Sequence, residues 1–290
     1  MKLELIISML LFSGLASCQP SGSEQKEVKN KENSTQQLPA LQADHTFVLP
    51  KQLDEISGIT FLANDTAHIY AIQDESGIVY AYHLASEKIV SEYEFANAGD
   101  YEEITNDGKY FYVLRSDGTI FSFPVDLKAA KTNVNIFEGQ LGKGEYESMS
   151  YDPDNKALYV LCKSCRQDKG KAIVSGYTIQ LQGNGQLSLG APFEIDLDAV
   201  NQLGGKALKS LKPSAIVKRS ATKDWYVLSS VDKLLLILDA SLKPKKLIRF
   251  DKKQFEQPEG ITFDQSDRMF ISSEKNKGDN ALLFQYTKQP

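Results

Sequence analysis

The sequence lacks the motifs that mark the most familiar catalytic and nucleic-acid-binding classes. It contains no G-x-S-x-G nucleophile motif, no H-E-x-x-H zinc motif and no glycine-rich phosphate-binding loop. Only 3 of its 290 residues are histidine, and a formal net charge of -5 gives no electrostatic footprint for a nucleic acid. We therefore predict no catalytic residue of these kinds and no nucleic-acid partner.

The apolar run at the N-terminus is too short to cross a bilayer as a permanent helix. It covers Leu5–Phe12, follows Lys2 and precedes Leu15-Ala16-Ser17-Cys18, where small residues before a cysteine are typical of a secretory cleavage site. This tetrapeptide resembles the bacterial lipobox, whose cysteine becomes the lipidated first residue of the mature protein. We predict a lipoprotein signal peptide over residues 1–18 with lipidation at Cys18. The alternative is an ordinary secreted protein with an unrelated cysteine.

Lipid chains on Cys18 would hold the protein at a membrane without a spanning helix. We therefore expect it in the cell envelope, anchored to the outer membrane and facing the periplasm or the cell surface. Residues 19–44 hold mainly Ser, Gln, Asn, Lys and Glu, which predicts a flexible tether. Residues 45–290 are long enough for one sizeable core, and the chain is 41% hydrophobic, so we predict a single globular domain and expect a monomer.

A short phrase recurs five times after residue 55, with glutamate or serine at the same point of each copy. The copies are Ile56-Ser57-Gly58-Ile59, Tyr101-Glu102-Glu103-Ile104, Tyr146-Glu147-Ser148-Met149, Pro213-Ser214-Ala215-Ile216 and Pro258-Glu259-Gly260-Ile261. Three of the four spacings between equivalent residues are 45 residues, and the spacing from Glu147 to Ser214 is 67. Self-similarity at about 40 to 50 residues, built from short strands, is typical of a β-propeller.

The ends of the repeat array predict how the ring closes. The fifth repeat reaches only its third strand, Ala281–Tyr286, before the chain ends. An unpaired strand at Thr46–Leu49 can supply the fourth, which removes the exposed edges of an open array. The predicted fold is therefore an all-β, five-bladed β-propeller closed by an N-terminal strand. The insertion Asp198–Leu211 predicts a short amphipathic helix, broken at Gly204-Gly205, that caps two blades.

The repeated phrase predicts a ring of polar side chains around the propeller axis, because the innermost strand of every blade lines the central channel. The ring consists of Ser57, Glu102, Glu147, Ser214 and Glu259. Three glutamates facing one another repel and lose hydration, which is unfavourable unless protons or a cation neutralise them. Calcium accepts six to eight oxygen ligands in flexible geometry, whereas zinc prefers nitrogen or sulfur. We predict a calcium ion bound by this ring; the alternative is that the glutamates only accept hydrogen bonds from backbone amides.

A second set of acids follows the second strand of two repeats. Asp74 and Glu75 follow that strand in the first repeat, and Glu274 follows it in the fifth. We predict Asp74 and Glu274 as further metal ligands on the same face. Glu103 is expected to alternate away from the axis.

Apart from Cys18, the cysteines form one C-x-x-C pair, Cys162 and Cys165, at the end of a predicted strand. A redox pair would suit a helix N-terminus, and a zinc site would need two further ligands. Outside the cytoplasm the default is a disulfide, which is our prediction.

Several stretches together resemble the SdiA-regulated family of bacterial envelope proteins. They are the lipobox, the blade phrases, Tyr70–Glu75, Gly99–Glu102, Tyr146–Pro153 and Gln257–Ile261. The likeness covers Leu53–Tyr286 and implies a five-bladed propeller with a calcium ion at a site typical of the family, without an established activity or ligand. The chain differs in its fourth repeat, where Pro213-Ser214-Ala215 replaces an acidic phrase. More distantly, the phrase resembles that of NHL-type propellers and of calcium-dependent lactonases related to paraoxonase.

Three functions fit these features. The first is a membrane-tethered, calcium-binding propeller that binds a small molecule or protein at the channel face, as a binding or scaffold module of the cell envelope. The second is a calcium-dependent hydrolase of an ester, lactone or phosphoester, with the metal as Lewis acid and a carboxylate as base. The third is a structural repeat protein that binds a partner through its rim. We predict the first.

Overall fold

The computed structural model describes residues 41–130, 133–251, 255–275 and 280–290. The predicted signal peptide, Cys18 and residues 19–40 of the predicted tether lie outside this part of the chain. Among the described residues, no helix has the length and apolarity needed to cross a membrane.

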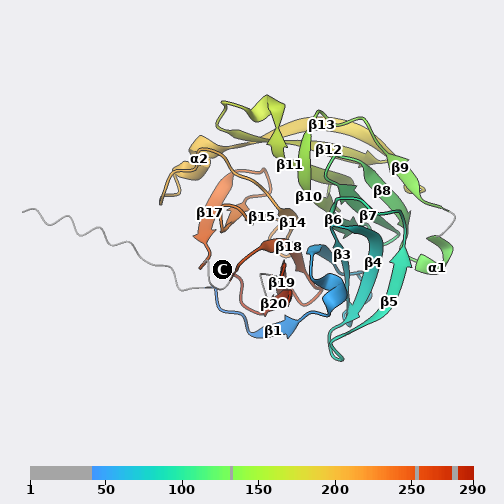
Figure 1. The fold of residues 1–290 in the computed structure, drawn as a ribbon. Helices are drawn as coiled ribbons and strands as arrows, with labels where there is room; N and C mark the ends of the chain where they lie inside the picture. The colour runs from blue at the N-terminus through green and yellow to red at the C-terminus, as the bar shows by residue number, and fades with distance from the viewer. Residues whose placement is uncertain (1–40, 131–132, 252–254, 276–279) are drawn as a thin grey trace, which may run out of the picture. The chain divides into compact units, whose positions relative to one another are not determined.

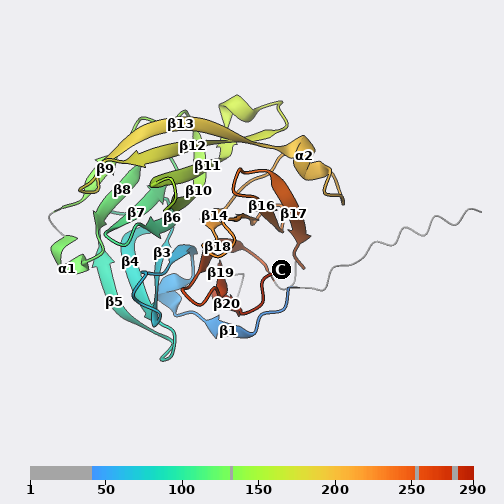
Figure 2. The ribbon, with the colours of Figure 1, turned by 180° about the vertical axis from the view of Figure 1, so that it is seen from behind.

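The described chain forms five antiparallel sheets of four strands each, arranged as blades around a common centre (Figures 1 and 2). From the innermost strand outward, the first blade contains β2 (Ile56–Thr60), β3 (His68–Gln73), β4 (Ser76–His83) and β5 (Lys88–Glu94), and the second contains β6 (Tyr101–Asn106), β7 (Tyr110–Arg115), β8 (Ile120–Pro124) and β9 (Asn135–Phe137). The third blade contains β10 (Gly144–Asp152), β11 (Ala157–Cys165), β12 (Ile173–Leu181) and β13 (Leu187–Asp196), and the fourth contains β14 (Ala215–Lys218), β15 (Trp225–Ser229), β16 (Leu234–Leu238) and β17 (Pro244–Arg249). The fifth blade contains β18 (Pro258–Phe263), β19 (Met269–Ser273), β20 (Leu282–Tyr286) and β1 (His45–Val48). The predicted five-bladed propeller is therefore confirmed.

The ring is closed by the N-terminal strand, as predicted. Strand β1 pairs antiparallel with β20, so that Thr46 lies opposite Phe284 and Val48 lies opposite Leu282. The last blade thus combines the two ends of the domain, and the pairing satisfies backbone groups that an open array would expose.

The innermost strands β2, β6, β10, β14 and β18 contact one another in order around the axis. Small residues in the repeated phrase allow this close approach. A Cβ atom added at Gly58 would lie 2.5 Å from the backbone nitrogen of Ile104, and one added at Gly260 would lie 2.5 Å from the carbonyl oxygen of Ser57. A larger side chain at either glycine would push neighbouring blades apart.

Apolar and aromatic side chains fill the spaces between blades. Between the first two blades, for example, the Phe95 and Phe123 rings stack with centroids 5.1 Å apart, and Tyr101 meets Phe95 edge-on at 5.0 Å. Stacked and edge-on aromatic pairs of this kind stabilise the fold by more than their buried apolar area alone accounts for. The blades are therefore joined by packing, and they hold the inner strand ends in fixed positions.

The insertion between the third and fourth blades forms a shorter helix than predicted. Helix α2 spans only Leu197–Asn201, so it ends before the predicted break at Gly204-Gly205, and the helix expected between that break and Leu211 is wrong. The Asn201 side chain accepts a hydrogen bond from the Leu208 amide (2.7 Å) and donates one to the Leu208 carbonyl (3.0 Å), which closes a loop in place of further helical turns.

The insertion nevertheless acts as the predicted cap. Leu197, Val200 and Leu211 are buried in one cluster with Ile195 of the third blade and Trp225 of the fourth. This packing fixes the insertion over the junction of the two blades.

Candidate functional site

The glutamate of the repeated phrase lies at an irregularity in the strand pairing, which directs its side chain towards the channel. In the second blade Tyr101 pairs with Arg115 and Glu103 pairs with Leu114, so Glu102 is left over as a β-bulge. The pairing register shifts in the same way at Glu147 and at Glu259. A bulged residue leaves the ladder and its side chain is re-aimed, which explains how the second, third and fifth blades present their acids to one space.

All seven predicted metal-site residues line one cavity of about 420 Å³ at the end of the channel where the inner strands begin. We call it the acidic cavity. Its full lining is Glu55, Ser57, Asp74, Asp100, Glu102, Ser116, Glu145, Glu147, Lys163, Ser214, Gln257, Glu259 and Glu274. The lining contains eight carboxyl groups and one ammonium group. Glu103 is absent from it, and Glu75 is exposed and lies outside it.

The lining comes from three equivalent positions of the blade repeat. The first is the phrase residue itself: Ser57, Glu102, Glu147, Ser214 and Glu259. The second lies two residues earlier: Glu55, Asp100, Glu145, Lys212 and Gln257. The third lies 14 to 17 residues after the phrase residue, next to the end of the second strand: Asp74, Ser116, Lys163, Ser230 and Glu274. All of these except Lys212 and Ser230 line the acidic cavity. An alignment of the five repeats by position would therefore have identified Glu55 and Lys163, whereas a search for recurring glutamate or serine did not.

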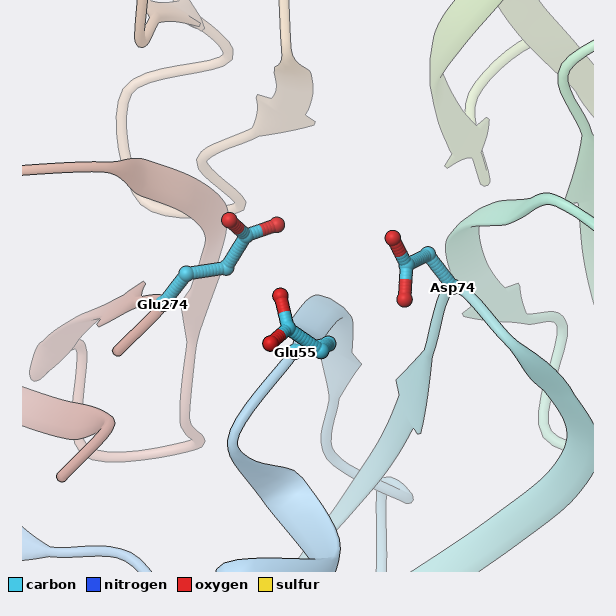
Figure 3. Close-up of side chains that lie close together, drawn as sticks. All are labelled: Glu55, Asp74 and Glu274. Carbon is cyan, nitrogen blue, oxygen red and sulfur yellow. The ribbon is translucent and has the colours of Figure 1, made fainter. Parts of the chain in front are cut away.

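Three carboxylates form the tightest group in the acidic cavity. Glu55 precedes β2, Asp74 follows β3 and Glu274 follows β19, and one ligand atom from each lies within 4.8 Å of the others. Their carboxyl groups face a shared space (Figure 3). Asp74 Oδ1 is buried and has no hydrogen-bond partner within the described residues. This group combines both predicted second-strand ligands with Glu55, which sequence reasoning missed.

The phrase glutamates have a protein cation beside them, which the sequence analysis did not foresee. Lys163 donates to Glu147, and Glu259 and Glu102 also lie within its electrostatic reach. Strand β11 continues to Cys165 and carries Lys163 into the cavity. The adjacent Cys162 and Cys165 are joined by a disulfide.

Burial and mutual repulsion favour protonation of these acids. Loss of hydration, followed by the negative charges of Glu147 and Asp100, raises the pKa of Glu102 to about 9. Loss of hydration and the charge of Glu259 raise the pKa of Glu274 to about 8. Burial also raises the pKa of Asp74 to about 6, with Glu55 as the next contributor.

Glu147 and Glu259 have partners that offset part of the free-energy cost of burying their charged form. Burial raises the pKa of Glu147 to about 7 despite its ion pair with Lys163. Burial also raises the pKa of Glu259, although hydrogen bonding from Ser230 and the charge of Lys163 oppose that rise. The acidic cavity therefore holds more negative charge than Lys163 neutralises.

The donor set fits a hard divalent cation. The acidic cavity offers carboxylate, hydroxyl and amide oxygens but no histidine or cysteine, and the Glu55, Asp74 and Glu274 group leaves a buried oxygen without a partner. Oxygen-only sites with several carboxylates suit calcium better than zinc. The cation could be held by Glu55, Asp74 and Glu274.

Solved structures resemble this fold at low sequence identity. Glutaminyl cyclase from Myxococcus xanthus is 15% identical with a TM-score of 0.55, and the match covers 86% of this chain and 97% of that protein. A luciferin-regenerating enzyme is 10% identical with a TM-score of 0.50, covering 84% of this chain and 95% of that protein. At such identity the likeness shows the fold alone.

No curated protein matches the sequence. The sequence model of the SdiA-regulated family, in contrast, matches residues 33–277, which include the acidic cavity and every blade strand except β20. The chain therefore belongs to the SdiA-regulated family.

Proposed function

We propose that this protein is a membrane-tethered, calcium-binding propeller that acts as a binding or scaffold module of the cell envelope. The observation that carries the proposal is the meeting of Glu55, Asp74 and Glu274 within 4.8 Å, around a buried Asp74 oxygen that has no partner among the described residues. Lipid chains on Cys18 would supply the tether.

The physical argument concerns charge. Desolvated carboxylates that face one another are unfavourable, and protonation relieves this only by removing their charge. A divalent cation relieves it while keeping the acids ionised, so cation binding and proton binding compete in the acidic cavity. The ion would stabilise the junction of the first and fifth blades, because Glu55 and Asp74 belong to one and Glu274 to the other.

A bound calcium ion would also provide a recognition point. Calcium takes six to eight oxygen ligands, so three carboxylates leave positions for water or for an oxygen of a ligand. The three histidines, His45, His68 and His83, lie in β1, β3 and β4, and none of them lines the acidic cavity. The alternative function, calcium-dependent hydrolysis of an ester, lactone or phosphoester, would use the ion as Lewis acid and a carboxylate of the acidic cavity as base.

Isothermal titration of the EDTA-stripped protein with calcium chloride tests the ion. We expect saturable binding that is weakened about tenfold or more in E274Q and in E55Q, since each removes a ligand charge, a loss of about 1.4 kcal/mol or more. The matched control is E75Q, which removes the same charge from an exposed position outside the acidic cavity. Calcium should also raise the melting midpoint of the wild type, because a ligand bound only by the native state stabilises it.

Absence of calcium uptake, together with an unchanged melting midpoint, would refute the cation site. Turnover of ester, lactone or phosphoester substrates that EDTA abolishes would replace the binding role by the hydrolase. The tether is tested separately: C18S should move the protein from the membrane fraction to the soluble fraction, and membrane retention would contradict lipidation at Cys18.

A further inference from the structure

A second, basic pocket lies beside the acidic cavity. It has a volume of about 740 Å³, within the range typical of small-molecule sites. Two irregular segments form its walls: Lys163–Ile173, which ends β11 and leads to β12, and Leu208–Lys212, the last part of the insertion. Lys163 lines both cavities, and it is the only residue that they share.

The basic pocket concentrates cations in an acidic protein. Its lining carries six: Lys163, Arg166, Lys169, Lys171, Lys209 and Lys212. Apart from Lys163, none of them has an ion-pair partner in the part of the chain that the structure describes. The protein as a whole has a net charge of -5, so this local excess is not a consequence of composition.

The one acid in the lining is already committed. The Asp168 carboxylate accepts a hydrogen bond from the Ser175 amide at 3.0 Å and another from the Ser175 hydroxyl. These bonds hold the loop against the start of β12. Asp168 therefore shapes the wall, and it is the single negative charge against six positive ones in the lining.

Both walls are held in place before any ligand arrives. The disulfide between Cys162 and Cys165 fixes the base of the first wall. In the second wall, buried Leu211 packs into the core, and the Lys212 amide donates to Asp232 at 3.0 Å. A pocket with fixed walls loses less conformational entropy on binding, which favours a specific ligand over loose surface attraction.

We propose that the basic pocket binds an anion that carries phosphate groups. Lysine ammonium groups bind phosphate oxygens as point charges, and the Arg166 guanidinium can donate two parallel hydrogen bonds to one phosphate. Six cations around one space suit a multiply charged anion better than a single carboxylate. Ile173, Leu208 and Leu211 add an apolar surface for the part of the ligand that bears the phosphates.

Such phosphates could belong to a soluble metabolite or to a lipid headgroup. Two probes separate these sources. Inorganic pyrophosphate, measured by isothermal titration on the full chain without divalent cations, represents the soluble source. Vesicles of phosphatidylcholine with and without phosphatidic acid, measured by cosedimentation with the C18S protein, represent the lipid source without the lipid anchor.

The test variant is the triple substitution R166Q/K169Q/K209Q, which removes three cations from the two walls. The control is K88Q/K109Q/K246Q, which removes three exposed lysines from other blades. We expect the test variant to lose pyrophosphate affinity about tenfold or more, and the control to stay within about twofold of the wild type. For the vesicles, each triple substitution is made in the C18S protein.

Binding of pyrophosphate with this pattern supports a soluble phosphorylated ligand. Binding only to vesicles that contain phosphatidic acid, with the same pattern, supports a lipid phosphate. Binding of neither probe by the wild-type pocket overturns the proposal, and so does an equal loss in test and control variants. None of these outcomes depends on calcium, so the proposal can fail while the cation site stands.

Discussion

Lys163 is the one ammonium group among eight carboxyl groups in the lining of the acidic cavity, and removing it should strengthen cation binding. Lys163 bonds to Glu147 and also lies within electrostatic reach of Glu102, Glu259 and Glu274. The substitution K163M keeps most of the side chain's length and removes its charge. It therefore removes the positive charge that would repel calcium in the acidic cavity.

Coulomb's law sets the scale of the effect. A pair of unit charges about 4 Å apart interacts by about 1 kcal/mol in water and about 4 kcal/mol at an effective dielectric constant of 20. The repulsion between Lys163 and a divalent ion involves twice the charge of such a pair, whereas doubling the separation halves the energy. The same range of about 1 to 4 kcal/mol therefore applies when Lys163 and the ion are about 8 Å apart. The lower part of this range is appropriate because the cavity opens to solvent, so we expect calcium affinity to rise about tenfold.

Titration of wild type and K163M with calcium at one pH and one salt concentration measures this change. K88M, which removes an exposed lysine from an outer strand, is the matched control. In EDTA the K163M protein should melt below the wild type, since Glu147 loses its partner, and calcium should raise its midpoint by more than that of the wild type. Unchanged or weaker calcium affinity in K163M would refute the view that the charge of Lys163 opposes cation binding in the acidic cavity.

Two further predictions concern buried groups outside the acidic cavity. Burial raises the pKa of Glu103 well above its ordinary value, so the folded state keeps a proton that the unfolded state releases and the wild type loses stability as pH rises above about 4.5. E103Q cannot lose that proton, so its melting midpoint relative to wild type should increase between about pH 5 and pH 8; a constant difference would contradict this. A Cβ atom at Gly144 would lie 2.3 Å from the sulfur of Cys165, so G144A should lower the free energy of unfolding by about 1 to 3 kcal/mol in denaturant melts of the oxidised protein. Reduction should shrink that loss because it frees the Cys165 side chain to rotate, and an equal loss in both redox states would show that the clash is not with the disulfide.

The fold could be predicted from the sequence because the same pattern of strands and turns recurs in all five blades. Each copy has strand-length apolar runs, polar turns and one phrase at a fixed position, so an error in one blade is corrected by the others. The missing fourth strand of the last blade then required the strand near Phe47, which pairs as expected. Where the chain leaves the repeat, no such redundancy exists, and the helix predicted up to Leu211 ends instead at Asn201.

The candidate site was predictable in part for the same reason. The phrase glutamates were found because their residue type recurs in three blades. Glu55 and Lys163 occupy equally regular positions, but the residue types at those positions change from blade to blade between acid, amide, serine and lysine. A search by residue type therefore misses them, whereas a search by position within the repeat finds them. Apart from Lys163 and Lys212, the cations of the basic pocket were beyond either search, because they lie in the segment between β11 and β12 and in the insertion, outside the equivalent positions of the repeat.

The fourth blade gives the mouth of the channel its asymmetry. Its three equivalent positions hold Lys212, Ser214 and Ser230, so it contributes no acid where every other blade contributes at least one. The departure from the acidic phrase at Ser214 thus belongs to a wider asymmetry of charge: the carboxylates come from the first, second, third and fifth blades, whereas the cations gather where the third blade meets the insertion before the fourth. A ligand with phosphate groups at this mouth would meet Lys163 and Lys212 on one side and a carboxylate-bound cation on the other. Because coupling between two bound species is reciprocal, any gain in phosphate affinity from the cation must equal the gain in cation affinity from the phosphate.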